Sequence, residues 1–293
     1  MKALAEFVMR GRLQALTVTV ASVASSVLCW LGAAVVALVI LRRGAAEGGW
    51  LLLWALLPAA LLAAVYADPG PLILLAGTGA LALVLRETVS LSLAVLASAM
   101  VGILSGAAML SFAGPLLEQV VLAFGGVLDA LAERLQAEGR SALELPRPTV
   151  LQVAGVLGAG NALTSVGCLL LARYWQAALY NPGGFGSEFR ALALPAAAAT
   201  ALLVLAVALW VLGYEYRTWA MVLLVPLSYT GVALVHYWAK ARGYGWGWLT
   251  GVYLLWLVLA VVRLALVVAA VADSYLHFRG RPSPPATGGP TEN

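Results

Sequence analysis

The sequence predicts an all-α membrane protein, a polytopic bundle of about eight transmembrane helices, with seven to nine allowed. Two observations support this fold class. The 293 residues are 63% hydrophobic and 10% charged, with a mean hydropathy of +0.96, whereas a soluble domain carries about 25% charged residues. The apolar residues also lie in long stretches, several of which exceed the roughly 20 residues that a helix needs to cross a bilayer.

The first stretch, 13–41, contains 29 residues and is longer than one bilayer crossing requires. It is either one tilted helix or two short limbs broken near Ser25. A span over 50–66 follows, and the Asp-Pro-Gly-Pro turn at 68–71 ends it. The next stretch, 72–85, has only 14 residues, so we expect it to be re-entrant or packed deep against its neighbours.

Two later spans, 89–111 and 149–172, each carry small residues at helical spacing. Small residues on one face allow a second helix to approach closely. We therefore expect each span to have a close-packing face, formed in the first by Ser98, Gly102 and Gly106 and in the second by Ala154, Gly158, Ala162 and Ser165.

The segment 112–148 between these spans is the longest polar region. Its leucines and valines recur at helical spacing opposite acidic residues, which is typical of an amphipathic helix outside the membrane. Its acidic face disfavours adhesion to anionic lipid, so we expect the apolar face to pack on protein.

The remaining expected spans are 196–213, 218–237 with a bend at Pro226, and 248–272. Residues 1–281 then form a single integral membrane domain, and the Pro- and Gly-rich segment 282–293 is a disordered tail.

Arg263 lies near the midpoint of the last expected span. A guanidinium at that depth costs about 2.5–3.5 kcal/mol, so it needs protein, water or a ligand as partner. It is either a counter-ion for an anionic ligand, or it pairs with a carboxylate or snorkels to the interface. The carboxylates in question are Glu87, Glu118 and Asp273.

Other polar residues in or near the spans are candidates for the same site. Asn161 and Ser165, with Thr164, either line a ligand site or join two helices. Asp273 and His277 are one helical turn apart and either share a proton or lie in interfacial water. The candidate ligand-binding residues are therefore Arg263, Asn161, Ser165, Asp273 and His277.

The sequence lacks the motifs for nucleotide hydrolysis, metal binding and nucleic-acid binding. Neither lysine, Lys2 or Lys240, completes a phosphate-binding loop, so we expect no nucleotide hydrolysis by this chain. The two histidines, His236 and His277, do not have metal-ligand spacing. No basic run suits nucleic acid. We expect no metal, no cofactor and no enzymatic activity.

Charge gives only a weak indication of orientation. With eight spans, nine Lys and Arg residues lie on the side of both termini and seven on the other. This bias favours both termini in the cytoplasm.

Three short patterns resemble a known family. They are the segment 231–236 ending in His236 with Lys240 and Arg242-Gly243 after it, the Phe189-Arg190 and Leu194-Pro195 pairs between two spans, and the ending with Asp273 and Phe278-Arg279. Their order is similar to that in the DUF2232 (YybS-like) family of bacterial multi-pass membrane proteins. That family is distantly similar to the S components of energy-coupling-factor transporters and to MreD.

The resemblance implies a multi-pass protein of the bacterial inner membrane, of Gram-negative type. An S component binds a small molecule and takes its ATPase from partner membrane subunits, which agrees with the missing phosphate loop. Our first hypothesis is therefore a non-enzymatic component for small-molecule binding or translocation, whose ligand lies between the Asn161 and Arg263 spans. The alternative is a scaffold for cell-envelope biogenesis that docks partners through the amphipathic segment.

Overall fold

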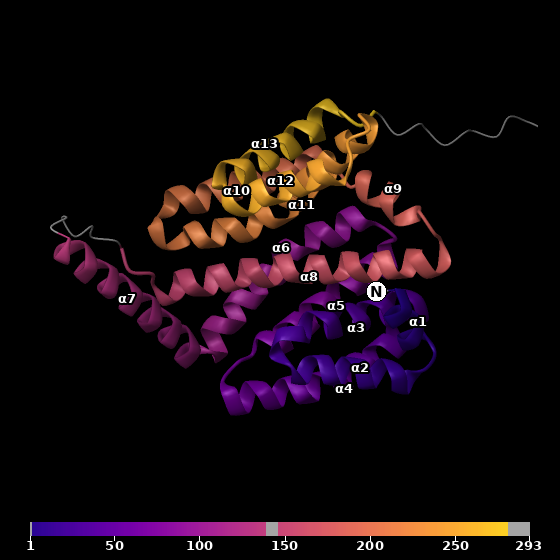
Figure 1. Ribbon diagram of the computed structural model, residues 1–293, viewed down its shortest axis with the longest axis horizontal. Helices are drawn as coiled ribbons and strands as arrows, with labels where there is room; N and C mark the ends of the chain where they lie inside the picture. The colour runs from indigo at the N-terminus through magenta and orange to yellow at the C-terminus, as the bar shows by residue number, and fades with distance from the viewer. Residues whose placement is uncertain (1, 139–145, 281–293) are drawn as a thin grey trace, which may run out of the picture.

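The computed structural model describes residues 2–138 and 146–280, and these residues form helices joined by short turns (Figure 1). The predicted all-helical fold class is confirmed. The helices are α1 Lys2–Met9, α2 Arg12–Ala24, α3 Cys29–Arg43, α4 Ala45–Tyr66, α5 Gly70–Thr88, α6 Leu91–Phe112, α7 Gly114–Ala137, α8 Val150–Tyr180, α9 Gly184–Arg190, α10 Ala196–Leu212, α11 Arg217–Ala241, α12 Trp246–Val258 and α13 Ala260–Leu276, with single 3₁₀ turns at Ser26–Leu28 and Tyr214–Tyr216.

Six of these helices are long and apolar enough to cross a membrane: α4, α5, α6, α7, α8 and α11 with the turn before it. A seventh crossing results if the broken pair α12–α13 counts as one, and α10 is a shorter apolar helix of 17 residues. The predicted short stretch 72–85 is part of the full-length α5, which extends to Gly70 and Thr88. The tail predicted over 282–293 lies outside the described residues.

The first apolar stretch forms a hairpin, which decides between the two alternatives that the sequence left open. α2 ends at Ala24, and α3 runs back beside it, so that Arg43 at its end donates a hydrogen bond to the Met9 carbonyl at 2.6 Å. Arg12 pairs with Glu47 at the same level. With 13 and 15 residues the limbs are about 20 and 22 Å long, shorter than the roughly 30 Å core of a bilayer. The chain therefore enters and leaves this hairpin at one end of the molecule.

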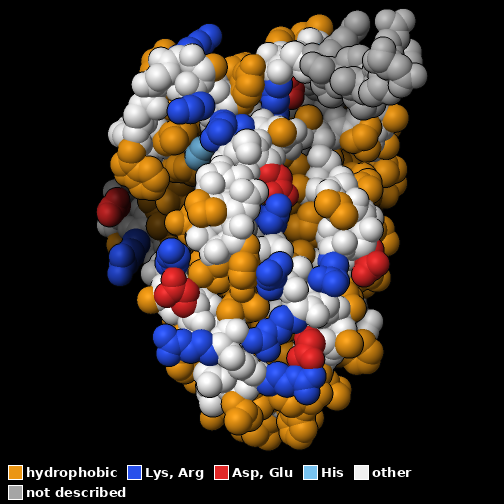
Figure 2. Space-filling model, turned by 90° about the vertical axis from the view of Figure 1, so that its right-hand side faces the viewer, with side chains coloured by type: hydrophobic (Ala, Val, Ile, Leu, Met, Phe, Trp, Pro, Cys, Tyr) orange, Lys and Arg blue, Asp and Glu red, His pale blue; other side chains and the backbone are white. Residues whose placement is uncertain are grey.

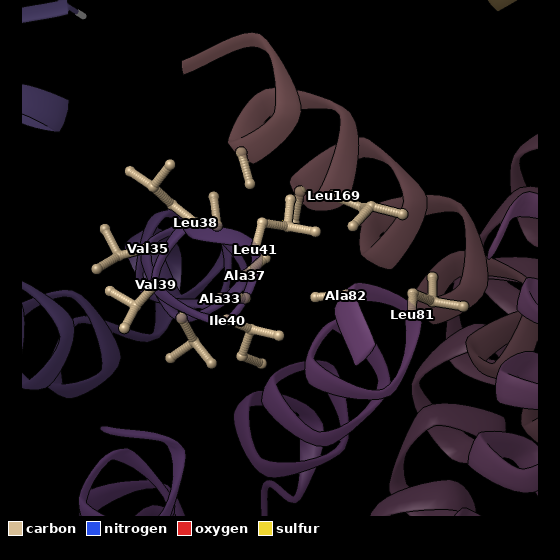
Figure 3. Packing of buried hydrophobic residues seen from close by; sticks show 14 of the residues in the cluster. Ala33, Val35, Ala37, Leu38, Val39, Ile40, Leu41, Leu81, Ala82 and Leu169 are labelled. Carbon is tan, nitrogen blue, oxygen red and sulfur yellow. The ribbon is translucent and has the colours of Figure 1, made fainter. Parts of the chain in front are cut away.

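The returning limb α3 is the core of the N-terminal half. All ten residues from Gly32 to Leu41 are buried, and none of them is polar. A helix that is apolar on every side needs protein all around it. Figure 3 shows its side chains radiating toward the neighbouring helices, where Ala82 of α5 and Leu169 of α8 meet it.

The long helix α8 runs between the two halves of the molecule (Figure 1). Its predicted small-residue face packs against the one predicted on α6. A Cβ atom on Gly158 would lie 2.5 Å from the Gly102 carbonyl oxygen, and one on Gly102 would lie 3.0 Å from that of Gly158. Both close-packing faces are confirmed, and they are partners of each other.

The prediction that residues 248–272 form a single helix is wrong. α12 and α13 meet at an angle of 111°, where Leu259 leaves the helical conformation with φ −104° and ψ 114°. After this break the chain returns toward its starting end, because the Phe278 ring lies 6.2 Å from that of Trp238. α13 is held on α11, where Leu266 backbone atoms leave no room for a Cβ on Gly231. This packing fixes the path of α13, and residues 257–261 contain no proline or glycine that would mark the break.

Most of the basic residues gather at one end of the bundle, which we call the basic end and which Figure 2 faces. Hydrogen bonds and an ion pair connect the helices at this end. Arg86 donates hydrogen bonds to the Ile40 and Leu41 carbonyls at 3.1 Å, and Arg173 pairs with Glu188 at 2.7 Å. Eleven of the described Lys and Arg residues lie in or next to the helix ends that meet here: Lys2, Arg10, Arg12, Arg42, Arg43, Arg86, Arg173, Arg190, Lys240, Arg242 and Arg279. The other four are Arg134, Arg147, Arg217 and Arg263. The nine-to-seven split predicted from eight simple crossings is wrong, because the two hairpins return the chain to the same end.

The predicted amphipathic segment forms α7, which projects from the bundle near the end opposite to the basic one (Figure 1). Among the described residues of α7, only Leu117 and Gly125 are buried, whereas Leu122 is 73% and Val127 65% exposed. The predicted packing of its apolar face on protein is therefore not found. An uncovered apolar face of this size is typical of a surface that meets lipid or a partner.

Candidate functional site

An apolar cavity between the two halves of the molecule, which we call the central cavity, has a volume of about 490 Å³. It lies between α8, α11 and α12, with α9 and the first turn of α3 closing its sides. Its lining residues are Trp30, Leu163, Thr164, Gly167, Cys168, Leu170, Leu171, Phe189, Ser228, Tyr229, Val232, Tyr253 and Trp256.

The polar groups of the central cavity bond mostly to the helices that carry them or to their neighbours. Tyr229 donates to the Leu163 carbonyl at 2.7 Å, and the Cys168 thiol donates to that of Trp30 at 3.2 Å. The hydroxyls of Thr164 and Ser228 each donate to a carbonyl one turn earlier in their own helix. With these groups occupied, the cavity offers mainly aliphatic and aromatic surface, which suits a hydrocarbon chain or ring.

One side of the central cavity is formed by a helix with few attachments. No residue of α12 is buried. Tyr253 and Trp256 of α12 line the cavity, and the Tyr253 hydroxyl bonds to Nε2 of His236 on α11 at 2.7 Å. The His236 ring in turn meets the edge of Phe189 at 5.3 Å. An element with few buried contacts is a local part of the fold that opens at low cost.

The predicted site residues Asn161 and Ser165 are on α8 but do not line the central cavity. Asn161 donates to the Ser105 hydroxyl of α6 at 2.7 Å, which joins the two helices. Ser165 is buried beside Gly77 of α5, where a Cβ on that glycine would lie 3.1 Å from its hydroxyl. Of the polar group predicted on this span, Thr164 alone faces the cavity.

Arg263 is not buried at the centre of a span. Its side chain is exposed in the first turn of α13, and it donates to the Leu257 carbonyl at 3.2 Å. That carbonyl belongs to the last turn of α12, where helix carbonyls lack partners within the helix. Arg263 therefore satisfies the backbone at the break, and the structure does not bring it together with Asn161.

Asp273 and His277 also have partners other than those expected. Asp273 is buried and forms an ion pair with Arg279 at 3.0 Å, whereas His277 is exposed and its ring bonds to the Tyr275 carbonyl at 2.9 Å. The contact between Asp273 and His277 is made by backbone, since the His277 N–H donates to the Asp273 carbonyl. The structure shows no proton-sharing pair of side chains here.

The guanidinium of Arg279 is largely buried, with a side-chain exposure of 9%. Besides Asp273, it binds the carbonyls of Arg190, Leu192 and Thr230. Burial lowers the pKa of this guanidinium, and the neighbouring Asp273 carboxylate opposes that shift. Arg279 thus joins α11, α13 and the turn after α9.

A second, polar cavity of about 380 Å³ lies at the basic end, lined by both charged and apolar groups. Arg173 and Glu188, which line it, are paired with each other, and Arg86 is bound to the end of α3. Within the described residues, no group of three or more His, Cys, Asp or Glu side chains is placed to hold a metal ion.

Sequence reasoning missed the aromatic walls of the central cavity. Trp30, Tyr229 and Trp256 lie in apolar stretches, where aromatic residues equally indicate core packing or a membrane interface. Only their convergence from three distant segments distinguishes them, and hydropathy along the chain does not contain that information.

Comparison with protein-family models, with curated proteins and with solved structures finds no match. The DUF2232 (YybS-like) resemblance therefore remains a prediction from the sequence.

Proposed function

We propose that this multi-pass membrane protein is a non-enzymatic binding component that takes a hydrophobic or amphiphilic small molecule into its central cavity. The observation that carries the proposal is the cavity itself, which is lined in part by α8 and α11, two helices that are long and apolar enough to span a membrane. Its volume of about 490 Å³ lies within the roughly 300–1,000 Å³ of ligand sites. A ligand that partitions into lipid would reach it laterally past α12.

Filling the cavity tests this proposal. Gly167 lines the cavity, and a Cβ there would have the Tyr229 hydroxyl as its nearest neighbour at 3.5 Å, so Gly167→Phe places a ring inside. Gly160 lies two turns earlier on the same helix with open space around it, so Gly160→Phe is the matched control. Native mass spectrometry of gently extracted protein should detect a bound amphiphile in the wild type and the control and lose it in Gly167→Phe. Equal retention in all three would refute the site.

Translocation would need a source of energy outside the chain. The absence of a phosphate-binding lysine motif from the sequence supports a partner ATPase, as the resemblance to S components implies. In this proposal the protein co-purifies with partner membrane subunits.

One observation favours the second candidate function, a scaffold in cell-envelope biogenesis. The apolar face of α7 is uncovered, with Leu122, Phe124 and Val127 more than half exposed. Deleting Gly114–Ala137 should then remove a co-purifying partner while the remaining helices stay folded. A partner that survives the deletion argues against the scaffold.

We further propose that the protein lies in the bacterial inner membrane with its basic end in the cytoplasm. Cytoplasmic flanks carry an excess of Lys and Arg, and eleven of the fifteen described basic residues lie at this end. The N-terminus and the end of α13 are both there, which would make both termini cytoplasmic.

A further inference from the structure

A second apolar cavity, which we call the α7 cavity, lies beneath the projecting helix at the end opposite to the basic one. Its volume is about 530 Å³. Val120 and Phe124 of α7 form one wall, and Val153 and Leu157 of α8 form another. The small-molecule site proposed above does not use this cavity, although the docking face of the second candidate function shares Phe124 with it.

Among the described residues that line the α7 cavity, Arg217 is the single cation. The Arg217 guanidinium stacks over two aromatic rings, 4.8 Å from the Trp210 centroid and 5.4 Å from that of Tyr214. Its Nε is buried and has no hydrogen-bond partner, and Arg217 forms no ion pair with any residue that the structure describes. A buried donor without a partner destabilises the structure, and more so when it is charged.

The helix that carries Arg217 increases the positive potential. Arg217 is in the first turn of α11, and no side chain caps that helix start. The helix dipole places partial positive charge at this end, so a cation there is unfavourable without an anion. Arg279, the buried arginine at the basic end, by contrast, is matched by Asp273. None of the lining residues that the structure describes for the α7 cavity is Asp or Glu.

We propose that the α7 cavity binds an anionic phospholipid of the surrounding bilayer, whose phosphate pairs with Arg217 and whose acyl chain lies beneath α7. The planar guanidinium suits a phosphate because it can donate two parallel hydrogen bonds. The cavity is continuous with surface that faces lipid, since Val156 and Met221 in its lining are about half exposed. The site is separate from the central cavity and does not depend on the proposed function.

The test uses the full chain in nanodiscs of phosphatidylcholine with a minor fraction of phosphatidylglycerol, followed by native mass spectrometry. The wild type should retain one phosphatidylglycerol in preference to phosphatidylcholine. Arg217→Gln should lower that retention at least tenfold, which corresponds to about 1.4 kcal/mol, and Arg217→Lys should lower it less. Arg147→Gln is the control, because Arg147 lies at the same end and pairs with Asp129 at 2.6 Å.

A second variant and a competition experiment test the acyl-chain part of the proposal. Phe124→Ala, on the half-exposed face of α7, leaves Arg217 in place and should weaken retention about threefold even if the Arg217 variants fold poorly. Glycerol phosphate, which has the anion but no acyl chain, should not displace the lipid at equal concentration. Wild-type retention by a folded Arg217→Gln, equal binding of the zwitterionic lipid, unchanged binding in Phe124→Ala, or displacement by glycerol phosphate would each overturn the proposal.

Discussion

Arg279 is buried among partners, whereas Arg263 is exposed. This is the reverse of what their sequence contexts predict. Arg263 lies within the longest apolar run of its region, and Arg279 follows the run near the chain end. Arg263 is exposed because the helix breaks at Leu259, just before it. Arg279 is buried because the end of the chain folds back, so that its guanidinium contacts Asp273 and the Leu192 carbonyl. Burial of a single side chain therefore depends on tertiary contacts that local hydropathy does not encode.

Removal of the Arg279 guanidinium should destabilise the fold strongly. Arg279→Gln leaves the buried Asp273 carboxylate without its ion pair and three carbonyls without their donor. Breaking one partner of a buried pair costs about 3–5 kcal/mol. Unfolding of purified protein in detergent should show this loss, and the exposed Arg242→Gln should not. Similar stabilities for the two variants would show that Arg279 is not a structural clamp.

Replacement of Arg263 should have little effect. Its guanidinium is exposed and binds a single carbonyl, so Arg263→Leu should change the free energy of unfolding by about 0.5–1.5 kcal/mol, the net value of one hydrogen bond. Amphiphile retention measured by native mass spectrometry should match the wild type. Loss of the amphiphile in a folded Arg263→Leu protein would show that Arg263 takes part in ligand binding.

The contact between α6 and α8 depends on glycine. Gly158→Ala places a Cβ 2.5 Å from the Gly102 carbonyl oxygen, so the two helices must separate. Overpacking of this kind costs about 1–3 kcal/mol. Gly160→Ala on the same helix meets open space and should be neutral or slightly stabilising, by up to about 1 kcal/mol. Equal thermal stability of the two variants would contradict the close approach.

The attachment of α12 to the rest of the bundle should depend on the hydroxyl of Tyr253. Tyr253→Phe removes the hydrogen bond to His236, which is the side-chain bond that joins α12 to α11 in the described structure. Cys168 lines the cavity that α12 covers, and in a Cys29→Ala background it is the single thiol of the chain. We expect N-ethylmaleimide to label Cys168 several-fold faster in Tyr253→Phe. An unchanged rate would show that α12 is held by other contacts.

At the scale of the whole molecule, the sequence is sufficient for the class of fold and for several local features. Composition requires lipid as solvent, and the glycine spacing on two spans predicts their contact faces correctly, because both properties are local in sequence. The path of the chain is less predictable. A hairpin such as 13–41 and a straight span share the same hydropathy, so the number of crossings, the sidedness of the charges and the composition of the cavity follow only from tertiary structure.

Side-specific cysteine labelling tests the central claim, that the α2–α3 and α12–α13 pairs each leave and re-enter the basic end. Single cysteines replace the exposed residues Arg10, Ala46, Gly243 and His277 in a chain with Cys29 and Cys168 changed to alanine. In sealed membranes, a membrane-impermeant maleimide should label all four from the same side. Labelling of positions 10 and 46, or of 243 and 277, from opposite sides would contradict the account.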